Sequence, residues 1–90
     1  MRMDVKKITA SADTITPARN TKLCTVLLDA GAAVAATVEI FDGTQSAGKS
    51  VAKLSATAGT SQSIELELLV TSGISATISG TGATAYVYYE

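Results

Sequence analysis

Histidine and tryptophan are absent from this sequence of 90 residues, and cysteine and proline each occur once. Without histidine, the chain lacks the most frequent general base of enzymes and the most frequent metal ligand. The single cysteine, Cys24, cannot form a disulfide within the chain or complete a zinc site. Its place in the apolar run 23–28 favours a buried small side chain over a nucleophile. We therefore expect a chain that is not an enzyme and holds no metal or cofactor.

Long apolar runs are also missing. No segment approaches the roughly 18 residues that a membrane-spanning helix requires. The start of the chain, Met1 to Lys7, has no apolar stretch of the kind found in signal peptides. We expect folding in the cytoplasm and no membrane partner. The formal net charge of −1 argues against nucleic acid as a partner, because nucleic-acid-binding surfaces are strongly basic.

The few charges are unevenly distributed along the chain. Basic side chains outnumber acidic ones in the first 22 residues, which carry Arg2, Lys6, Lys7, Arg19 and Lys22 against Asp4 and Asp13. The remainder of the chain is acidic. One interpretation is chance scatter over a solvated surface. The other is that residues 1–20 form a basic N-terminal arm or first strand that docks on an acidic surface of this chain or of a neighbour.

Apolar residues recur with a period of two along the rest of the chain, which predicts β-strands. In residues 63–68, three apolar side chains alternate with Glu65 and Glu67. The same alternation runs through 36–42, 74–79 and 83–90. The side chains expected to point inward are Val38, Ile40, Ile64, Leu66, Leu68, Ile74, Ala76, Ile78, Ala85, Val87 and Tyr89.

Other segments give less regular signals. Residues 22–29 are nearly all apolar, as in a strand that is covered on both faces. Residues 50–56 fit either a strand or one to two helical turns. Residues 5–10 and 13–16 are candidates for an N-terminal strand broken before Pro17.

Turn residues separate these runs at short intervals. Gly80-Thr81-Gly82 joins two alternating runs and predicts a tight antiparallel hairpin. About seven short strands separated in this way are typical of an all-β fold. We expect a small antiparallel β-sandwich or jelly-roll-like barrel in a single domain, residues 21–90.

One segment matches a catalytic motif. Gly43 to Ser50 follows the phosphate-binding loop pattern G-x-x-x-x-G-K-[ST] letter for letter. That motif requires a following helix whose N-terminus faces the phosphate, whereas only the short segment 50–58 precedes Gly59. We interpret Gly43–Ser50 as an ordinary loop between strands that binds no nucleotide.

Aromatic side chains are few, and three of the four stand close to the end of the sequence: Phe41, Tyr86, Tyr88 and Tyr89. Tyr86 and Tyr88 share one strand face, and Phe41 is expected on the outward face of another strand. They fit either core packing or pairing between neighbouring strands. The alternative is a subunit or partner interface, because tyrosine supplies a large contact area with few rotamers to freeze. The candidate interface residues are Arg2, Lys6, Lys7, Arg19, Phe41, Tyr86 and Tyr88.

The order of these elements resembles that of the small virion-associated β-sandwich proteins of tailed bacteriophages. The resemblance covers about residues 20–90. It rests on the strand and turn Ala-Thr-Val-Glu-Ile-Phe-Asp-Gly-Thr at 36–44 and on Ser-Gly-Ile-Ser-Ala-Thr-Ile-Ser-Gly at 72–80. Proteins of this kind decorate or cement capsids, or form spikes and head-fibre bases.

The resemblance implies a non-enzymatic cement or decoration protein of the virion. Its partner would be the major capsid protein, and it would form a homo-oligomer, with a trimer favoured. Two other hypotheses remain open. One is a tail or head-fibre adhesin that binds host glycans, and the other is an NTPase built on Gly43–Ser50.

Overall fold

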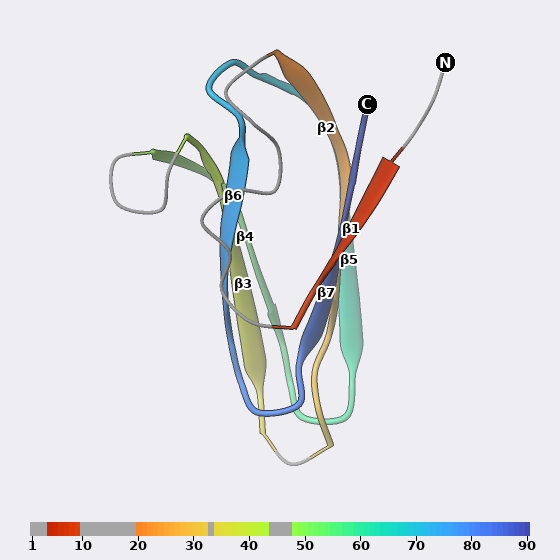
Figure 1. Ribbon diagram of the computed structural model, residues 1–90. Coiled ribbons are helices and arrows are strands. Elements are labelled where there is room, and N and C mark those ends of the chain that lie inside the picture. Colours follow the sequence, from red (N-terminus) through yellow and green to blue (C-terminus); the bar gives the residue numbers. More distant parts are fainter. Residues whose placement is uncertain (1–3, 10–19, 33, 44–47) are drawn as a thin grey trace.

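The computed structural model describes residues 4–9, 20–32, 34–43 and 48–90. Within these ranges the chain forms seven β-strands and no helix, which confirms the all-β prediction (Figure 1). The strands are β1 (Asp4–Ile8), β2 (Thr21–Asp29), β3 (Ala36–Asp42), β4 (Lys49–Ala56), β5 (Ser61–Val70), β6 (Ile74–Ser79) and β7 (Thr84–Tyr89).

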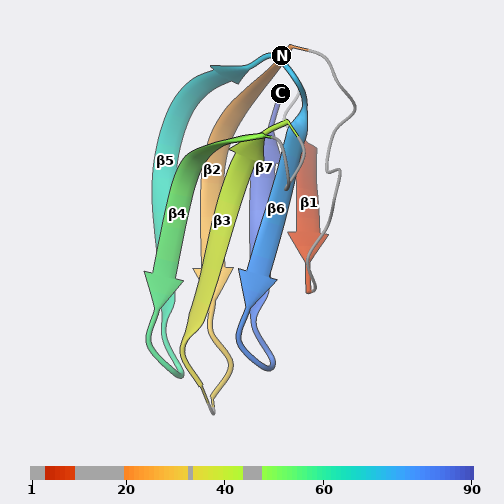
Figure 2. The same cartoon turned by 90° about the vertical axis from the view of Figure 1, so that its left-hand side faces the viewer.

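The strands form two antiparallel sheets that pack face to face (Figure 2). One sheet has four strands in the order β1-β7-β2-β5, and the other has three in the order β4-β3-β6. Of the two architectures expected from the sequence, the β-sandwich is the one observed. In Figure 2 β1 lies to the side of β6, so the four-stranded sheet reaches beyond the edge of the three-stranded one.

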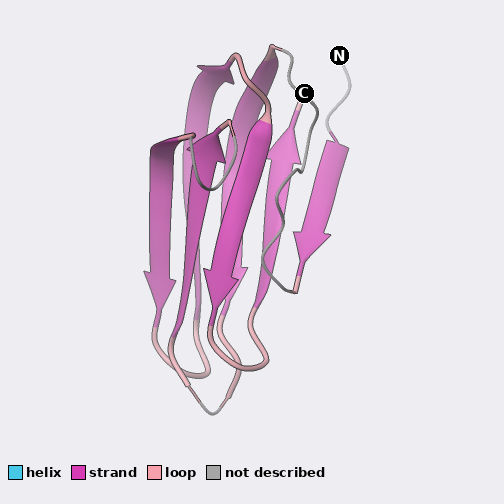
Figure 3. Ribbon diagram, turned by 60° about the vertical axis from the view of Figure 1, so that its left-hand side comes forward, coloured by secondary structure: helices cyan, strands magenta, loops and turns pink. Residues whose placement is uncertain are grey.

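Most connections between successive strands cross from one sheet to the other (Figure 3). Among the strands that the structure describes, only β3 and β4 are both consecutive in the sequence and paired in the same sheet. The predicted hairpin at residues 80–82 is therefore wrong. The tight turn exists, because the N–H of Ala83 donates to the carbonyl oxygen of Gly80 at 3.1 Å, but it leads from β6 in one sheet to β7 in the other.

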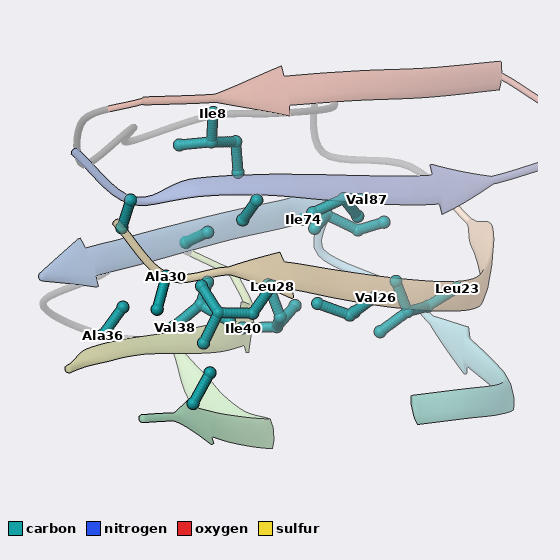
Figure 4. Close-up of a cluster of buried hydrophobic side chains, with 14 of the residues drawn as sticks. Ile8, Leu23, Val26, Leu28, Ala30, Ala36, Val38, Ile40, Ile74 and Val87 are labelled. Atoms are coloured by element: carbon teal, nitrogen blue, oxygen red, sulfur yellow. The ribbon is translucent and has the colours of Figure 1, made fainter. Parts of the chain in front are cut away.

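The core lies between the two sheets and is built from alternate side chains (Figure 4). Val38 and Ile40 from β3 and Ala85 and Val87 from β7 are fully buried, as predicted. Ile64, Leu66 and Leu68 of β5 are only partly buried against this core, because β5 lies at the edge of its sheet, and only Val70 at the end of the strand is fully buried. The core is therefore thin and aliphatic, which is what a sandwich of this size can enclose.

One extra residue interrupts the regular alternation in β2. Leu23 lies opposite Tyr89 and Thr25 opposite Tyr88, although these tyrosines are adjacent in β7. Cys24 is thus the additional residue of a β-bulge. Leu23 remains fully buried in the core, whereas Cys24 and Thr25 both line a hollow on the outer face of the sheet.

The two ambiguous segments can now be placed. Residues 49–56 form strand β4 and not helical turns. The N-terminal candidate 5–10 corresponds to β1, which pairs with β7. The other N-terminal candidate, 13–16, lies outside the described residues.

Candidate functional site

Two of the tyrosines project from the outer face of the four-stranded sheet. Side chains directly opposite each other on neighbouring strands point to the same face. Tyr88 lies between Val5 of β1 and Thr25 of β2, and Tyr86 lies between Lys7 and Leu27. We call this surface the tyrosine face and define it by Val5, Lys7, Thr25, Leu27, Tyr86 and Tyr88.

The tyrosine face is accessible, with its apolar groups spread over three strands. Val5 is 53% exposed and Tyr86 and Tyr88 are half-buried. A shallow hollow extends over β7, β2 and β5 and is lined by Thr25, Leu27, Ser63 and Tyr88. A largely flat surface with amphipathic aromatic groups suits contact with another macromolecule better than enclosure of a small ligand.

The structure brings together only some of the residues predicted as one interface. Tyr86, Tyr88 and Lys7 share the tyrosine face. Phe41 does not, because it pairs with Ser50 and Ser75 in the other sheet and points to the opposite side of the sandwich. Lys6 lies opposite the buried Val87 and therefore on the inner side of β1, although its side chain is exposed. Arg2 and Arg19 lie outside the described residues.

Three residues of this face were missed by the sequence analysis. Val5, Thr25 and Leu27 join the tyrosines through pairing between strands that are distant in the sequence. The only local signal was the alternation of Val5 with Lys6 in a short polar strand. Pairing partners cannot be read from such a signal.

A second, more polar hollow of about 380 Å³ lies beyond the bulge, on the same outer side. Its lining residues are Lys22, Cys24, Thr25, Glu65, Leu66, Glu67 and Glu90. Lys22 and Glu90 exchange backbone hydrogen bonds of 3.1 and 2.9 Å, and their charged groups lie 3.8 Å apart. The Cys24 thiol donates to the Glu90 carboxylate at 3.4 Å.

These surroundings suppress the reactivity of Cys24. Burial, followed by the hydrogen bond to Glu90 and the negative charge of that carboxylate, raises the pKa of the Cys24 thiol above its ordinary value, against an opposing effect of Lys22. A thiol that stays protonated at neutral pH is a poor nucleophile. Cys24 is thus a buried small side chain, as the sequence predicted.

Neither hollow shows a metal-binding arrangement. Among the residues that the structure describes, no group of three or more histidine, cysteine, aspartate or glutamate side chains is arranged to hold a metal ion. The same part of the chain contains no helix long and apolar enough to cross a membrane.

The phosphate-loop pattern occupies a hairpin. Gly43 follows β3, and Lys49 begins β4, which pairs antiparallel with β3. The helix that a phosphate-binding loop requires is thus replaced by a strand. The Ser50 hydroxyl, which would bind Mg²⁺ in that motif, donates instead to the Glu39 carboxylate at 2.6 Å. The pattern match therefore gives no structural support for a nucleotide site.

The sequence matches no protein-family model, and no curated protein matches it significantly. The fold and the surface define the class, which is a small two-sheet antiparallel β-sandwich with an aromatic outer face.

Proposed function

We propose that this protein is a non-enzymatic structural component of a tailed-phage virion, which binds the capsid surface and stabilises it. The observation that carries the proposal is the tyrosine face, where Tyr86 and Tyr88 stand accessible on the outer side of a sheet. Tyrosine is enriched among the residues that contribute most to binding at interfaces, and the half-buried rings of Tyr86 and Tyr88 leave area for such a contact.

The character of the tyrosine face fits a broad protein partner. Each tyrosine combines an apolar ring with a hydroxyl group that can bond to a partner's polar groups. Val5 and Leu27 add apolar area on either side of β7. The proposed partner is the major capsid protein, at seams between its subunits.

Side chains of opposite charge lie at the two sides of the tyrosine face. Lys7 lies at its β1 side, whereas Glu65 lies opposite Thr25 on β5. A surface that is basic at one side and acidic at the other restricts the orientations in which it can dock. This restriction suits a protein that occupies equivalent positions on a symmetric particle, which here is the virion. The proposed protein is a homo-oligomer there, with a trimer as the favoured state.

The experiment is binding to capsids purified from a phage that lacks the gene for this chain. The wild-type protein should sediment with these capsids and raise the temperature at which they break open. The double variant Tyr86→Ser/Tyr88→Ser should lose about tenfold or more in affinity, since aromatic anchors dominate such interfaces. Phe41→Ser, on the opposite side of the sandwich, is the matched control and should bind as the wild type does.

Two results would contradict the proposal. Wild-type protein that fails to sediment with the capsids would remove the cement function. Binding to host glycans on an array, lost in the tyrosine double variant, would assign the tyrosine face to an adhesin.

A further inference from the structure

Two edge strands of the four-stranded sheet carry exposed apolar side chains on the same face. Among the described residues, the exposed large hydrophobic side chains are Val5 (53%), Val34 (41%) and Leu69 (60%). Val5 belongs to β1 and Leu69 to β5, the strands at the two ends of this sheet. Both point outward, because Val5 lies opposite Tyr88 and Leu69 opposite Lys22.

We propose that copies of this chain associate head to tail, with β1 of one copy adding as a strand to the edge of β5 of the next. The inference goes beyond the proposed virion role and does not rest on it. It concerns contacts between identical chains, and purified protein alone can test it.

The strand directions allow this addition. Neighbours in the sheet are antiparallel throughout, so β1 runs antiparallel to β5. A second copy placed beyond β5 in the same orientation would therefore continue the antiparallel sheet. Its outer face would also remain on the outer side.

One register between β1 and the neighbouring copy's β5 places complementary side chains opposite each other. If Lys7 of one copy lies opposite Glu67 of the next, antiparallel pairing places Val5 opposite Leu69. The contact then joins the two most exposed large hydrophobic side chains and adds a pair of opposite charges beside them. Cross-strand pairs of both kinds stabilise a sheet.

The inner face is compatible with the same register. Ile8 lies opposite Leu66, so two inward apolar side chains become neighbours. Lys6 lies opposite Leu68, where its alkyl chain can cover the leucine while the ammonium group stays in water.

Charge also selects the partner edge. A symmetric β1–β1 contact centred on Lys6 or Lys7 would oppose the lysines of two copies, and a β5–β5 contact centred on Leu66 or Glu67 would oppose the glutamates of two copies. Like charges directly opposite each other destabilise a sheet. The β1–β5 contact pairs lysine with glutamate. It is heterologous, so it builds a ring if the rotation between copies closes and an open filament if it does not.

The first test uses single cysteines in a Cys24→Ala background. Val5→Cys and Leu69→Cys should each remain uncrosslinked alone and should form a disulfide-linked dimer when mixed and oxidised. Within one chain the two sites are separated by at least three strand spacings, about 14 Å or more, which is too far for a disulfide. Val34→Cys, which is exposed but lies on neither edge strand, is the control and should not cross-link with either variant.

The second test reverses charges. Lys7→Glu or Glu67→Lys alone should weaken self-association about tenfold, by replacing attraction with repulsion. An equimolar mixture of the two variants, or the double variant Lys7→Glu/Glu67→Lys, should restore it, as measured by analytical ultracentrifugation. Circular dichroism of each variant shows whether the fold is intact.

Three results would overturn the proposal. One is a wild-type chain that stays monomeric at every concentration at which it is soluble. Another is Val5→Cys or Leu69→Cys cross-linking to itself as readily as to the other. The third is folded charge-reversal variants that associate as the wild type does. Failure to bind capsids, with these tests positive, would leave the head-to-tail contact standing.

Discussion

The carboxylate of Asp42 accepts the backbone N–H of Ser72 at 2.9 Å. Asp42 ends β3 in the three-stranded sheet, and Ser72 lies in the turn that carries the chain from β5 to β6. The N–H of Thr71 approaches the same carboxylate oxygen at 3.3 Å. This carboxylate therefore closes one end of the sandwich by holding the crossing turn against the end of a central strand.

Replacement of Asp42 should loosen this end. Asp42→Ala is expected to lower the free energy of unfolding by about 1–2 kcal/mol, because two backbone N–H groups lose a charged acceptor. Asp29→Ala, at the exposed end of β2, is the matched control and should change stability by less than about 0.5 kcal/mol. Urea titrations of both variants provide the measurement. Equal effects would show that the Asp42 contact contributes nothing specific.

The turn between β6 and β7 should tolerate no side chain at Gly80. Its φ is +111°, and a Cβ there would lie 2.6 Å from the carbonyl oxygen of Ala35. Gly59 also has a positive φ, +75°, but a Cβ there would meet nothing within 4 Å. Gly80→Ala should cost at least ~2 kcal/mol and Gly59→Ala about 1 kcal/mol, because only the first adds a collision to the strained backbone. Thermal unfolding of the two variants compares them directly, and the reverse order would contradict the explanation.

Stability should fall in alkaline solution because of Cys24. Burial and the contact with Glu90 raise the pKa of its thiol in the folded chain. The stability that the protonated thiol contributes is complete below the unfolded pKa and is lost as pH rises through the folded one. The free energy of unfolding of the wild type should therefore decline above about pH 8.5 more steeply than that of Cys24→Ala. The measurement is a series of urea titrations at different pH values. If the free energies of unfolding of the two proteins fall equally with pH, the thiol has no part in the decline.

Nucleotide should leave the thermal stability of the chain unchanged. Ser50 is engaged by Glu39 within paired strands, so the Gly43–Ser50 pattern lacks the helix that would complete a phosphate site. Saturating Mg²⁺–ATP should shift the unfolding temperature by less than about 1 °C, because a ligand stabilises only a chain that it binds. A larger shift that disappears in Lys49→Ala would revive the NTPase hypothesis.

Local sequence pattern was sufficient to predict individual strands. The boundaries expected for 36–42 and 74–79 are those of β3 and β6, because alternation of apolar and polar residues directly reflects burial of one sheet face. The same alternation correctly separated Val87 from Tyr86 and Tyr88, which lie on the other face of β7. Ser75 shows its limit, since this polar residue is fully buried and its hydroxyl donates to the carbonyl oxygen of Gly43.

Strand partners could not be predicted in the same way. A glycine turn such as 80–82 reverses the chain equally well within a sheet or between two sheets, and the choice depends on which core faces meet. For the same reason the sequence placed Phe41 with the tyrosines, although the two sets lie on opposite sides of the sandwich. The bulge at Cys24 also carries no sequence signal of its own, because the segment 22–29 is nearly all apolar and shows no clear alternation that a bulge could interrupt.

The position of β7 has a consequence for the order in which the protein forms. This strand is the last of the seven to be synthesised, yet it lies between β1 and β2, which are the first two. The four-stranded sheet therefore cannot assemble progressively as the chain emerges from the ribosome, and the early strands must wait for β7 to link them. Pairings between strands that are distant in the sequence make folding slow. The four-stranded sheet should therefore form late and cooperatively, and the newly made chain should remain vulnerable to proteases until Thr84–Tyr89 has paired with β1 and β2.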